Sequence, residues 1–321
     1  MKVLHFVWSR TFGGIERLVV DLVREQQRLG YGEQGLLFGK GGGELVEDFS
    51  SLDVQQKVAD LTSGLDFRAE KGAQVADYMS AFDIVHFHTF NPLIARAAIR
   101  AGSRIVYTEH GNFGFGRKRT LQDVVRDRLL RRFLNRHVDA VTFNSAFTRA
   151  TAEARYGLEG VERHLVYNGV PQSRTRGGVI DEATKAALAG RFVVGTSSRL
   201  AGFKRVDRLI EAFARFQPGR NTVLLIVGDG IERAKLEAQV DQLGLQERVL
   251  FVGYRREVQA YQAAMDVCVF PSENEPFGLV AVETMNLGKP TLVFSDGGGL
   301  CEIVAGLDLD DVVPSTDVLA A

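Results

Sequence analysis

Short apolar runs alternate with amphipathic stretches along almost the whole chain. In the first half, the runs typical of buried strands are residues 3–8, 35–38, 84–87, 105–108, 140–143 and 164–167. In the second half they are residues 192–196, 223–227, 249–252, 267–270 and 291–294. Helical patterns lie between them, for example at residues 15–29, where apolar side chains recur at helical spacing. This alternation predicts parallel sheets that are covered by helices on both faces.

One polar, glycine-rich stretch, residues 171–190, interrupts the rhythm near the middle of the 321 residues. A chain of this length suggests two domains of about 150 residues. We therefore predict an α/β fold of two tandem doubly wound, Rossmann-like domains, residues 1–170 and 191–321, joined by a linker at 171–190. Doubly wound sheets bind ligands beyond the carboxyl ends of their strands, so we expect the site on those loops, in a cleft between the domains.

Composition narrows the class of protein. The chain is 45% hydrophobic and 25% charged, as in soluble globular proteins, and its formal net charge of −1 argues against a nucleic-acid partner. The two cysteines lie in apolar contexts, which predicts buried thiols in a reducing compartment. The first apolar run ends at residue 8, too short for a signal peptide or a membrane span. We expect a cytoplasmic protein.

The most informative stretch is residues 270–283, in which a strand turns through Pro-Phe-Gly into a helix. Such a turn presents free backbone N–H groups at the positive end of the helix dipole, which is an anion site. Glu275 and Glu283 flank it, and carboxylates repel an anion. We therefore expect them to bind hydroxyl groups attached to that anion. A nucleotide sugar, with a diphosphate between hydroxyl-bearing ends, has this layout.

Two cations follow the first strand of the second half. Arg199 and Lys204 are placed to neutralise a diphosphate, where charge-assisted hydrogen bonds contribute roughly 1.5–3 kcal/mol each. Taken alone, the segment also fits a solvated basic loop, and we interpret Arg205 and Arg208 in that way.

Glycines mark two further turns. Gly13 and Gly14 follow the first strand and open a helix, so the backbone there can approach a ligand closely; a simple turn is the alternative. Val252 and Gly253 end another strand, where backbone groups could meet a base edge, or again only turn the chain. The Gly-x-Gly-x-x-Gly fingerprint is absent here, which disfavours a dehydrogenase.

Three histidines lie in the first half near strand ends. His86 and His88 share one face of a strand, and His110 follows the next strand. Zinc needs a third and a fourth ligand, and no Cys or Glu cluster accompanies the pair, so we predict no metal site. His110 stands where a chemically active side chain would lie, although a structural role fits a lone histidine as well.

Residues 117–137 carry eight Lys and Arg against two Asp, with a stripe of apolar positions at helical spacing. A basic amphipathic helix can bind an anionic lipid surface, at about 1 kcal/mol per basic residue. A core-packing helix with a solvated basic face is the alternative. Both interpretations stay open, and peripheral membrane contact through this segment is one of them.

Taken together, these motifs resemble the retaining glycosyltransferases of family 4, which have the two-domain GT-B fold. Glu275 to Glu283, with Phe277 and Gly278 between, is similar to that family's Glu-x7-Glu element. The resemblance covers nearly the whole chain because the other motifs fall in the family's order: Gly13-Gly14, His86-Phe87-His88, His110, Asn168-Gly169-Val170 and Arg199 with Lys204.

The resemblance implies roles for the anion-binding residues. Arg199 and Lys204 would bind the donor diphosphate. Gly278 and Leu279 would donate backbone N–H groups to it, with Gly14 approaching from the first domain. No metal or other cofactor is implied, since these cations and the helix N-terminus can offset the charge of the leaving group.

The resemblance also implies roles for the residues around the sugars. Glu283 would hold the ribose hydroxyls, and Val252 and Gly253 would line the base. Glu275 would hold hydroxyls of the transferred sugar. His110 would lie by its reactive face, and the leaving phosphate would help to deprotonate the acceptor. We expect the acceptor to carry a hydroxyl, on a lipid-linked or cell-envelope glycan.

One departure keeps alternatives open. The family continues beyond a segment like residues 312–321, so we expect the usual final helices to be lacking here. A truncated, non-catalytic nucleotide-binding protein is therefore one alternative to a sugar transferase. A nucleotide-sugar epimerase of the same fold is another, which the Glu275 to Glu283 element disfavours.

Overall fold

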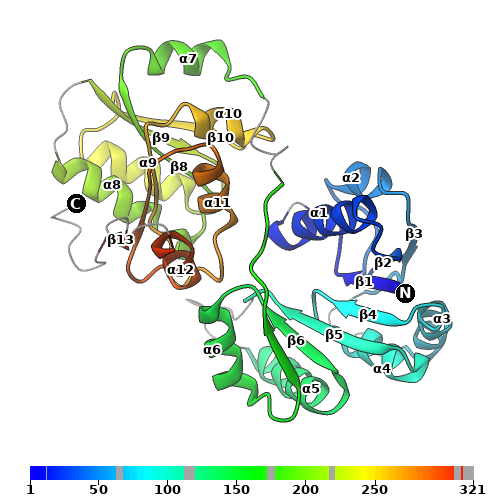
Figure 1. Ribbon diagram of the computed structural model, residues 1–321. Coiled ribbons are helices and arrows are strands. Elements are labelled where there is room, and N and C mark those ends of the chain that lie inside the picture. Colours follow the sequence, from blue (N-terminus) through cyan, green and yellow to red (C-terminus); the bar gives the residue numbers. More distant parts are fainter. Residues whose placement is uncertain are drawn as a thin grey trace. The chain divides into compact units, whose positions relative to one another are not determined.

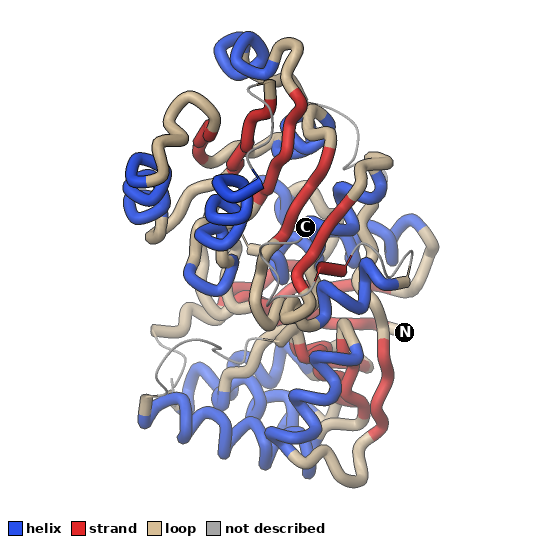
Figure 2. Tube along the Cα trace, turned by 90° about the vertical axis from the view of Figure 1, so that its left-hand side faces the viewer, coloured by secondary structure: helices blue, strands red, loops and turns tan. Residues whose placement is uncertain are grey.

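The computed structural model describes residues 1–11, 13–62, 68–111, 120–171, 178–216, 221–306 and 312–313. The chain divides into two compact units, Met1–Gly169 and Val170–Ala321 (Figure 1). Each unit is built on one parallel sheet with helices on both faces (Figure 2). The predicted class, two doubly wound α/β domains in tandem, is confirmed.

The first unit has a sheet in the order β3-β2-β1-β4-β5-β6-β7. Its strands are β1 (Lys2–Val7), β2 (Glu33–Phe38), β3 (Gln55–Val58), β4 (Ile84–Phe87), β5 (Arg104–Glu109), β6 (Ala140–Phe143) and β7 (Glu162–Leu165). Its helices are α1 (Gly14–Arg28), α2 (Val46–Ser50), α3 (Ala69–Met79), α4 (Pro92–Ala101), α5 (Leu121–His137) and α6 (Ala146–Tyr156).

Side chains of β1 alternate between two cores. Leu4 and Phe6 pack into the core that α3, α4, α5 and α6 complete. Val7 packs into a second core with Val19 of α1 and Phe49 of α2. The two cores therefore lie on opposite faces of the sheet, as the period of two in a strand requires.

The second unit has a sheet in the order β10-β9-β8-β11-β12-β13. Its strands are β8 (Phe192–Ser197), β9 (Thr222–Val227), β10 (Val249–Gly253), β11 (Val267–Phe270), β12 (Thr291–Phe294) and β13 (Val312–Val313). Its helices are α7 (Glu182–Leu188), the 3-10 turn η2 (Gly202–Lys204), α8 (Val206–Phe216), α9 (Arg233–Gln242), α10 (Val258–Ala263), α11 (Leu279–Asn286) and α12 (Gly299–Ala305).

Two cores again divide the helices of this unit. Ile210 of α8 and Leu236 of α9 pack on one face of the sheet. Tyr261 of α10, Ala281 of α11 and Leu300 of α12 pack on the other. The loops at the carboxyl ends of the strands are left to carry the polar groups.

Each sheet reverses its strand order at one point. In the first unit β1 pairs with both β2 and β4, and in the second β8 pairs with both β9 and β11. The loops that leave β1 and β4, and those that leave β8 and β11, therefore diverge at a topological switch point. Open α/β sheets bind their ligands there.

Several elements differ from the sequence prediction, among them the two-residue strand β13, which was not predicted. The strand β3 was not predicted because its sequence, QQKV, is polar and mostly exposed. The edge strand β7 begins two residues earlier than the run at 164–167, and all four of its residues are exposed. The predicted linker 171–190 contains α7, whose Leu188 packs in the core of the second unit. Residues 182–188 thus belong to that unit and not to a linker.

Some predictions fall on residues outside the described part. Residues 117–119 of the basic segment lie there, and so do 307–311 and 314–321, so the expectation about final helices is not addressed. Within the described ranges, no helix has the length and apolar character needed to cross a membrane.

Candidate functional site

Backbone hydrogen bonds join the loops at the switch point of the second unit. The amide of Glu273, after β11, donates to the carbonyl of Phe203, after β8, at 2.8 Å. The amide of Glu275 donates to the carbonyl of Gly297, after β12, at 3.0 Å. The amide of Leu200 donates to the carbonyl of Asp229, after β9, at 2.9 Å. Four strand ends thus form one connected rim.

Two predicted site residues meet on this rim. Nζ of Lys204 lies 2.6 Å from Oε2 of Glu275, and the two side chains are only 11% and 13% exposed. An ammonium has three N–H donors, so two remain for another ligand. The second carboxylate oxygen of Glu275 likewise remains able to accept from a hydroxyl. The pair thus places a cation beside a carboxylate that can accept hydrogen bonds from hydroxyl groups.

The turn from β11 into α11 is built around Gly278. Gly278 caps the helix with φ at 90°, and a Cβ there would overlap Cδ1 of Leu300, so only glycine fits. Within the described residues, the amides of Gly278 and Leu279 donate no backbone hydrogen bond. Phe277, at 4% exposure, anchors the turn in the interior. The N–H groups remain available for a ligand.

The residues predicted to hold the ribose and the base lie on α11 and at the end of β10. Glu283 of α11 is 8% exposed, and Nε2 of Gln262 lies 3.5 Å from its Oε2. The same Nε2 donates to Oγ of Ser197, at the end of β8, at 2.9 Å. Val252 and Gly253 end β10, and the carbonyl of Gly253 accepts from the amide of Gly228.

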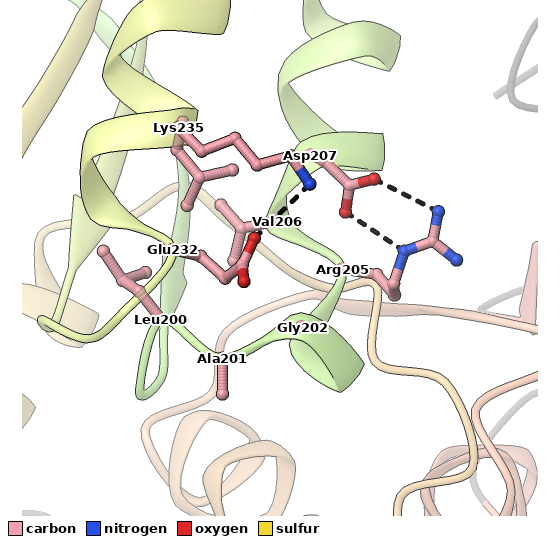
Figure 3. Close-up of a pocket in the computed structure, with 9 residues that line it drawn as sticks. Leu200, Ala201, Gly202, Arg205, Val206, Asp207, Glu232 and Lys235 are labelled. Atoms are coloured by element: carbon pink, nitrogen blue, oxygen red, sulfur yellow. Dashed lines mark hydrogen bonds and ion pairs between the residues drawn. The ribbon is translucent and has the colours of Figure 1, made fainter. Parts of the chain in front are cut away.

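The basic residues after β8 have different environments. The side chain of Arg199 is exposed at the rim. Arg205 forms two hydrogen bonds with Asp207, both 3.1 Å (Figure 3). It forms a third with Glu273 at 3.0 Å. Arg208 bonds to Asp296 at 2.6 Å. The interpretation of Arg205 and Arg208 as solvated loop residues is therefore wrong: they hold three loops together, and their acidic partners neutralise them.

A small pocket lies beside these loops (Figure 3). Its lining includes Leu200, Gly202, Asp207 and Glu232, and it encloses about 60 Å³. Pockets for drug-sized ligands enclose about 300–1,000 Å³, so this one is too small to hold a nucleotide by itself.

Gly13 and Gly14 lie at the switch point of the first unit. Gly13 is the N-cap of α1 in extended conformation, and Gly14 is its exposed first residue. The backbone of Gly13 is extended, and the nearest atoms to a Cβ at that position would be those of the flexible Glu16 carboxylate, so the local geometry does not require a glycine there. The pair thus forms the predicted strand-to-helix turn.

A cluster of histidines lies at the same switch point. Nδ1 of His5, in β1, is 3.1 Å from Nε2 of His88, which follows β4. Nδ1 of His88 is 3.1 Å from Nε2 of His110, which follows β5. Nε2 of His86 is 2.6 Å from Oγ1 of Thr108. The three histidines singled out from the sequence are brought together, and His5 joins them.

His5 and its partner Gln26 were not predicted. Every residue of β1 after the first is buried, so the strand shows no alternation that would single out His5. The parallel register, which places His5 opposite His86, is the signal that identifies it. Nitrogen atoms of His5, His86 and His88 lie within 4.8 Å of one another, so the third histidine whose absence argued against a metal is present.

Burial keeps these rings neutral. Loss of solvent lowers the pKa of His5 to about 4 and that of His110 to about 4. Burial, with repulsion from the neighbouring histidines, lowers the pKa of His86 and of His88 well below the ordinary value of 6.5. At neutral pH each ring therefore carries one N–H and one lone pair.

We predict that the first unit loses stability as the pH falls from about 6.5 to about 4. In that window an unfolded His5 binds a proton and the folded one does not, so acid favours unfolding. His5 alone accounts for about 3 kcal/mol. Urea unfolding across the window measures the loss. His5→Gln should flatten the slope, whereas His164→Asn, at an exposed ring, should not; an unchanged slope in His5→Gln would contradict the assignment.

Comparison with known protein families gives two matches. Residues 12–174, half of the chain, match the family described as Glycosyltransferase Family 4. Residues 181–311 match the family described as Glycosyl transferases group 1.

Among curated proteins, the 2-deoxystreptamine glucosyltransferase of Streptomyces kanamyceticus is 38% identical over 118 residues, 36% of this chain and 30% of that protein. The Vi polysaccharide biosynthesis protein VipC/TviE of Salmonella typhi is 32% identical over 184 residues, 54% of this chain and 32% of that protein. The chain thus spans about a third of the length of these relatives. The crystal structure of HepE from Anabaena with UDP has a TM-score of 0.76 and 25% identity, covering 95% of this chain and 83% of that one.

Proposed function

This chain belongs to glycosyltransferase family 4, and from that premise we propose that it moves a sugar from a nucleotide diphosphate sugar to a hydroxyl acceptor with retention of anomeric configuration. The observation that carries the proposal is the Lys204–Glu275 ion pair on the rim at the switch point of the second unit. The pair holds a cation that can bind a diphosphate next to a carboxylate that can bind sugar hydroxyls, and both are in place before the donor binds.

The reaction breaks the bond between the anomeric carbon and the diphosphate oxygen and forms a bond from that carbon to the acceptor oxygen. The acceptor proton passes to the leaving phosphate. Arg199, Lys204 and the N–H groups of Gly278 and Leu279 take the developing negative charge, which is the step that preorganised donors accelerate most. We propose no metal for this step, because these groups supply the positive charge.

The remaining predicted residues complete the proposal. Glu275 holds hydroxyls of the transferred sugar, and Glu283 holds those of the ribose. Val252 and Gly253 line the base, while Gly13 and Gly14 contribute to donor binding from the first unit. His110 lies by the transferred sugar.

Names of relatives suggest the first substrates to test. Crystal structures of Anabaena HepE contain UDP, or UDP and glucose, so a UDP-sugar is the donor we propose first. Relatives include proteins of Vi polysaccharide biosynthesis and of lipopolysaccharide core biosynthesis. These names support a cell-envelope or lipid-linked glycan as the acceptor.

The basic face of α5 supports a lipid surface as a further partner. Arg128, Arg131, Arg132 and Arg136 are exposed, and none forms an ion pair within the described residues, while Leu121 is 80% exposed beside them. We propose peripheral contact with anionic membranes, in the cytoplasm, where the free thiols of the chain would stay reduced. Flotation with anionic vesicles that is unchanged when the four arginines are replaced by Gln would refute this contact.

Thermal unfolding with UDP, GDP, ADP and their sugars tests the proposed donor. A ligand at 100 times its dissociation constant adds about 2.7 kcal/mol of stability. We expect one nucleotide series, with UDP first, to raise the unfolding temperature by several degrees. A shift with turnover only when an acceptor is present supports the transferase. Conversion of the donor alone would favour an epimerase, and a shift without any turnover would favour a non-catalytic binder.

A further inference from the structure

A line of hydrogen bonds runs from helix α1 to the end of β5. Oε1 of Gln26 lies 3.0 Å from Nε2 of His5, and from there the line continues through His88 to His110 in two steps of 3.1 Å. The ring centroids are 5.4 Å apart in the first step and 5.3 Å in the second, with interplanar angles of 27° and 25°. The rings thus meet edge to edge, so each nitrogen points at its neighbour.

The polarity of this line follows from its first member. A carbonyl oxygen only accepts, so Nε2 of His5 must donate to Gln26. A neutral His5 then has a bare Nδ1, which must accept from Nε2–H of His88. The same step repeats at His88, whose bare Nδ1 accepts from Nε2–H of His110. Because burial keeps the rings neutral, only one tautomer of each ring satisfies these hydrogen bonds.

We propose that Gln26 fixes the tautomer of His110 through His5 and His88, so that Nδ1 of His110 is always a hydrogen-bond acceptor. Gln26, His5 and His88 are positioning residues, and His110 is the group that meets substrate. Resting on the proposed function, this tautomer selects a hydroxyl donor on the transferred sugar at that position and rejects a carbonyl or an ether oxygen.

The same geometry disfavours a metal at His5, His86 and His88, although their nitrogen atoms come within 4.8 Å. An ion such as Zn²⁺ needs one lone pair from each ring directed at a common point about 2.0–2.1 Å away. His5 uses both nitrogens in hydrogen bonds, to Gln26 and to His88, and His86 donates or accepts at Thr108. The lone pairs of His5 and His88 are directed along the line and not towards a common centre.

Nitrogen-15 NMR of the histidine rings tests the proposal without substrate, near neutral pH. We expect His5, His88 and His110 of the wild type each to show a protonated Nε2 and a bare Nδ1, with assignments from single His→Asn variants. Gln26→Met removes the acceptor and should leave His110 as a mixture of tautomers. Gln27→Met is the matched control, since the side chain of Gln27 donates to the carbonyl of Asp53 on the surface, and it should change nothing.

Two results would overturn the proposal. One is a His110 that is protonated on Nδ1 in the wild type, or whose tautomer is unchanged in Gln26→Met. The other is stoichiometric Zn²⁺ uptake that shifts the signals of His5, His86 and His88 together. Because the tautomers are read without turnover, a chain that fails to transfer sugar would refute the proposed function and leave this result standing.

Discussion

Replacing Lys204 by Met should lower the free energy of unfolding of the second unit by about 3 kcal/mol. The substitution leaves the Glu275 carboxylate, 13% exposed, without the cation 2.6 Å away. A buried charge without its partner costs about 3–5 kcal/mol, and the residual exposure places this site at the lower end. Glu275→Gln should lower the free energy of unfolding by a similar amount, because it leaves the Lys204 ammonium, 11% exposed, without its carboxylate partner.

A double-mutant cycle distinguishes the interaction energy of this ion pair from other destabilising effects of the two substitutions. The protein with both Lys204→Met and Glu275→Gln should recover much of the loss, because no unpaired charge remains. Denaturant unfolding of the four proteins gives the coupling energy. Arg215→Met is the control, because its pair with Glu211 is 44% and 48% exposed and should contribute under about 1 kcal/mol. Additive losses in the cycle would contradict the account of a preorganised pair.

The same variants separate stability from donor binding. The double variant should stay folded because no unpaired charge remains. If Lys204 binds the diphosphate, this variant should gain no stability from the nucleotide sugar. A donor-induced shift of wild-type size in the double variant would remove Lys204 from the proposed site.

The second large effect is expected at Gly278. Gly278→Ala must place a Cβ at φ 90° and against Cδ1 of Leu300, which is fully buried in the core with Ala281. The left-handed backbone alone costs about 1–2 kcal/mol. The clash adds to this and displaces the start of α11, so we expect a loss of donor binding as well as of stability.

Gly288→Ala is the matched control for this prediction. Gly288 also has positive φ, at 69°, but nothing lies within 4 Å of its Cβ position. It should therefore show the backbone cost only, with donor binding intact. Thermal unfolding of both variants with and without donor makes the comparison, and equal losses in the two would show that the contact with Leu300 is not a constraint.

The sequence predicted the elements whose residues are buried on both faces. The run at 223–227 became β9, in which every residue is buried, and the apolar stripe after Phe277 became α11. It missed β3 and shifted β7 by two residues, because these two edge strands expose most of their side chains. The edge strand β10, which is buried or half-buried along its length, was predicted. An apolar pattern reveals a strand only where its side chains are buried.

For the site, the sequence identified residues but not their partners. Lys204 and Glu275 are 71 positions apart, and only the pairing of β8 with β11 brings them together. Arg205 was not distinguished from its neighbours because its partner Glu273 lies on another strand end. His5 was missed for the same reason: its significance depends on the register with β4.

The most direct test of the central claim is the anomeric configuration of the product. The purified chain, an α-linked nucleotide sugar and a hydroxyl-bearing glycan acceptor are incubated together, and the new linkage is read by proton NMR. Retaining transfer predicts an α-linked product that forms only when the acceptor is present. A β-linked product would contradict the proposed function.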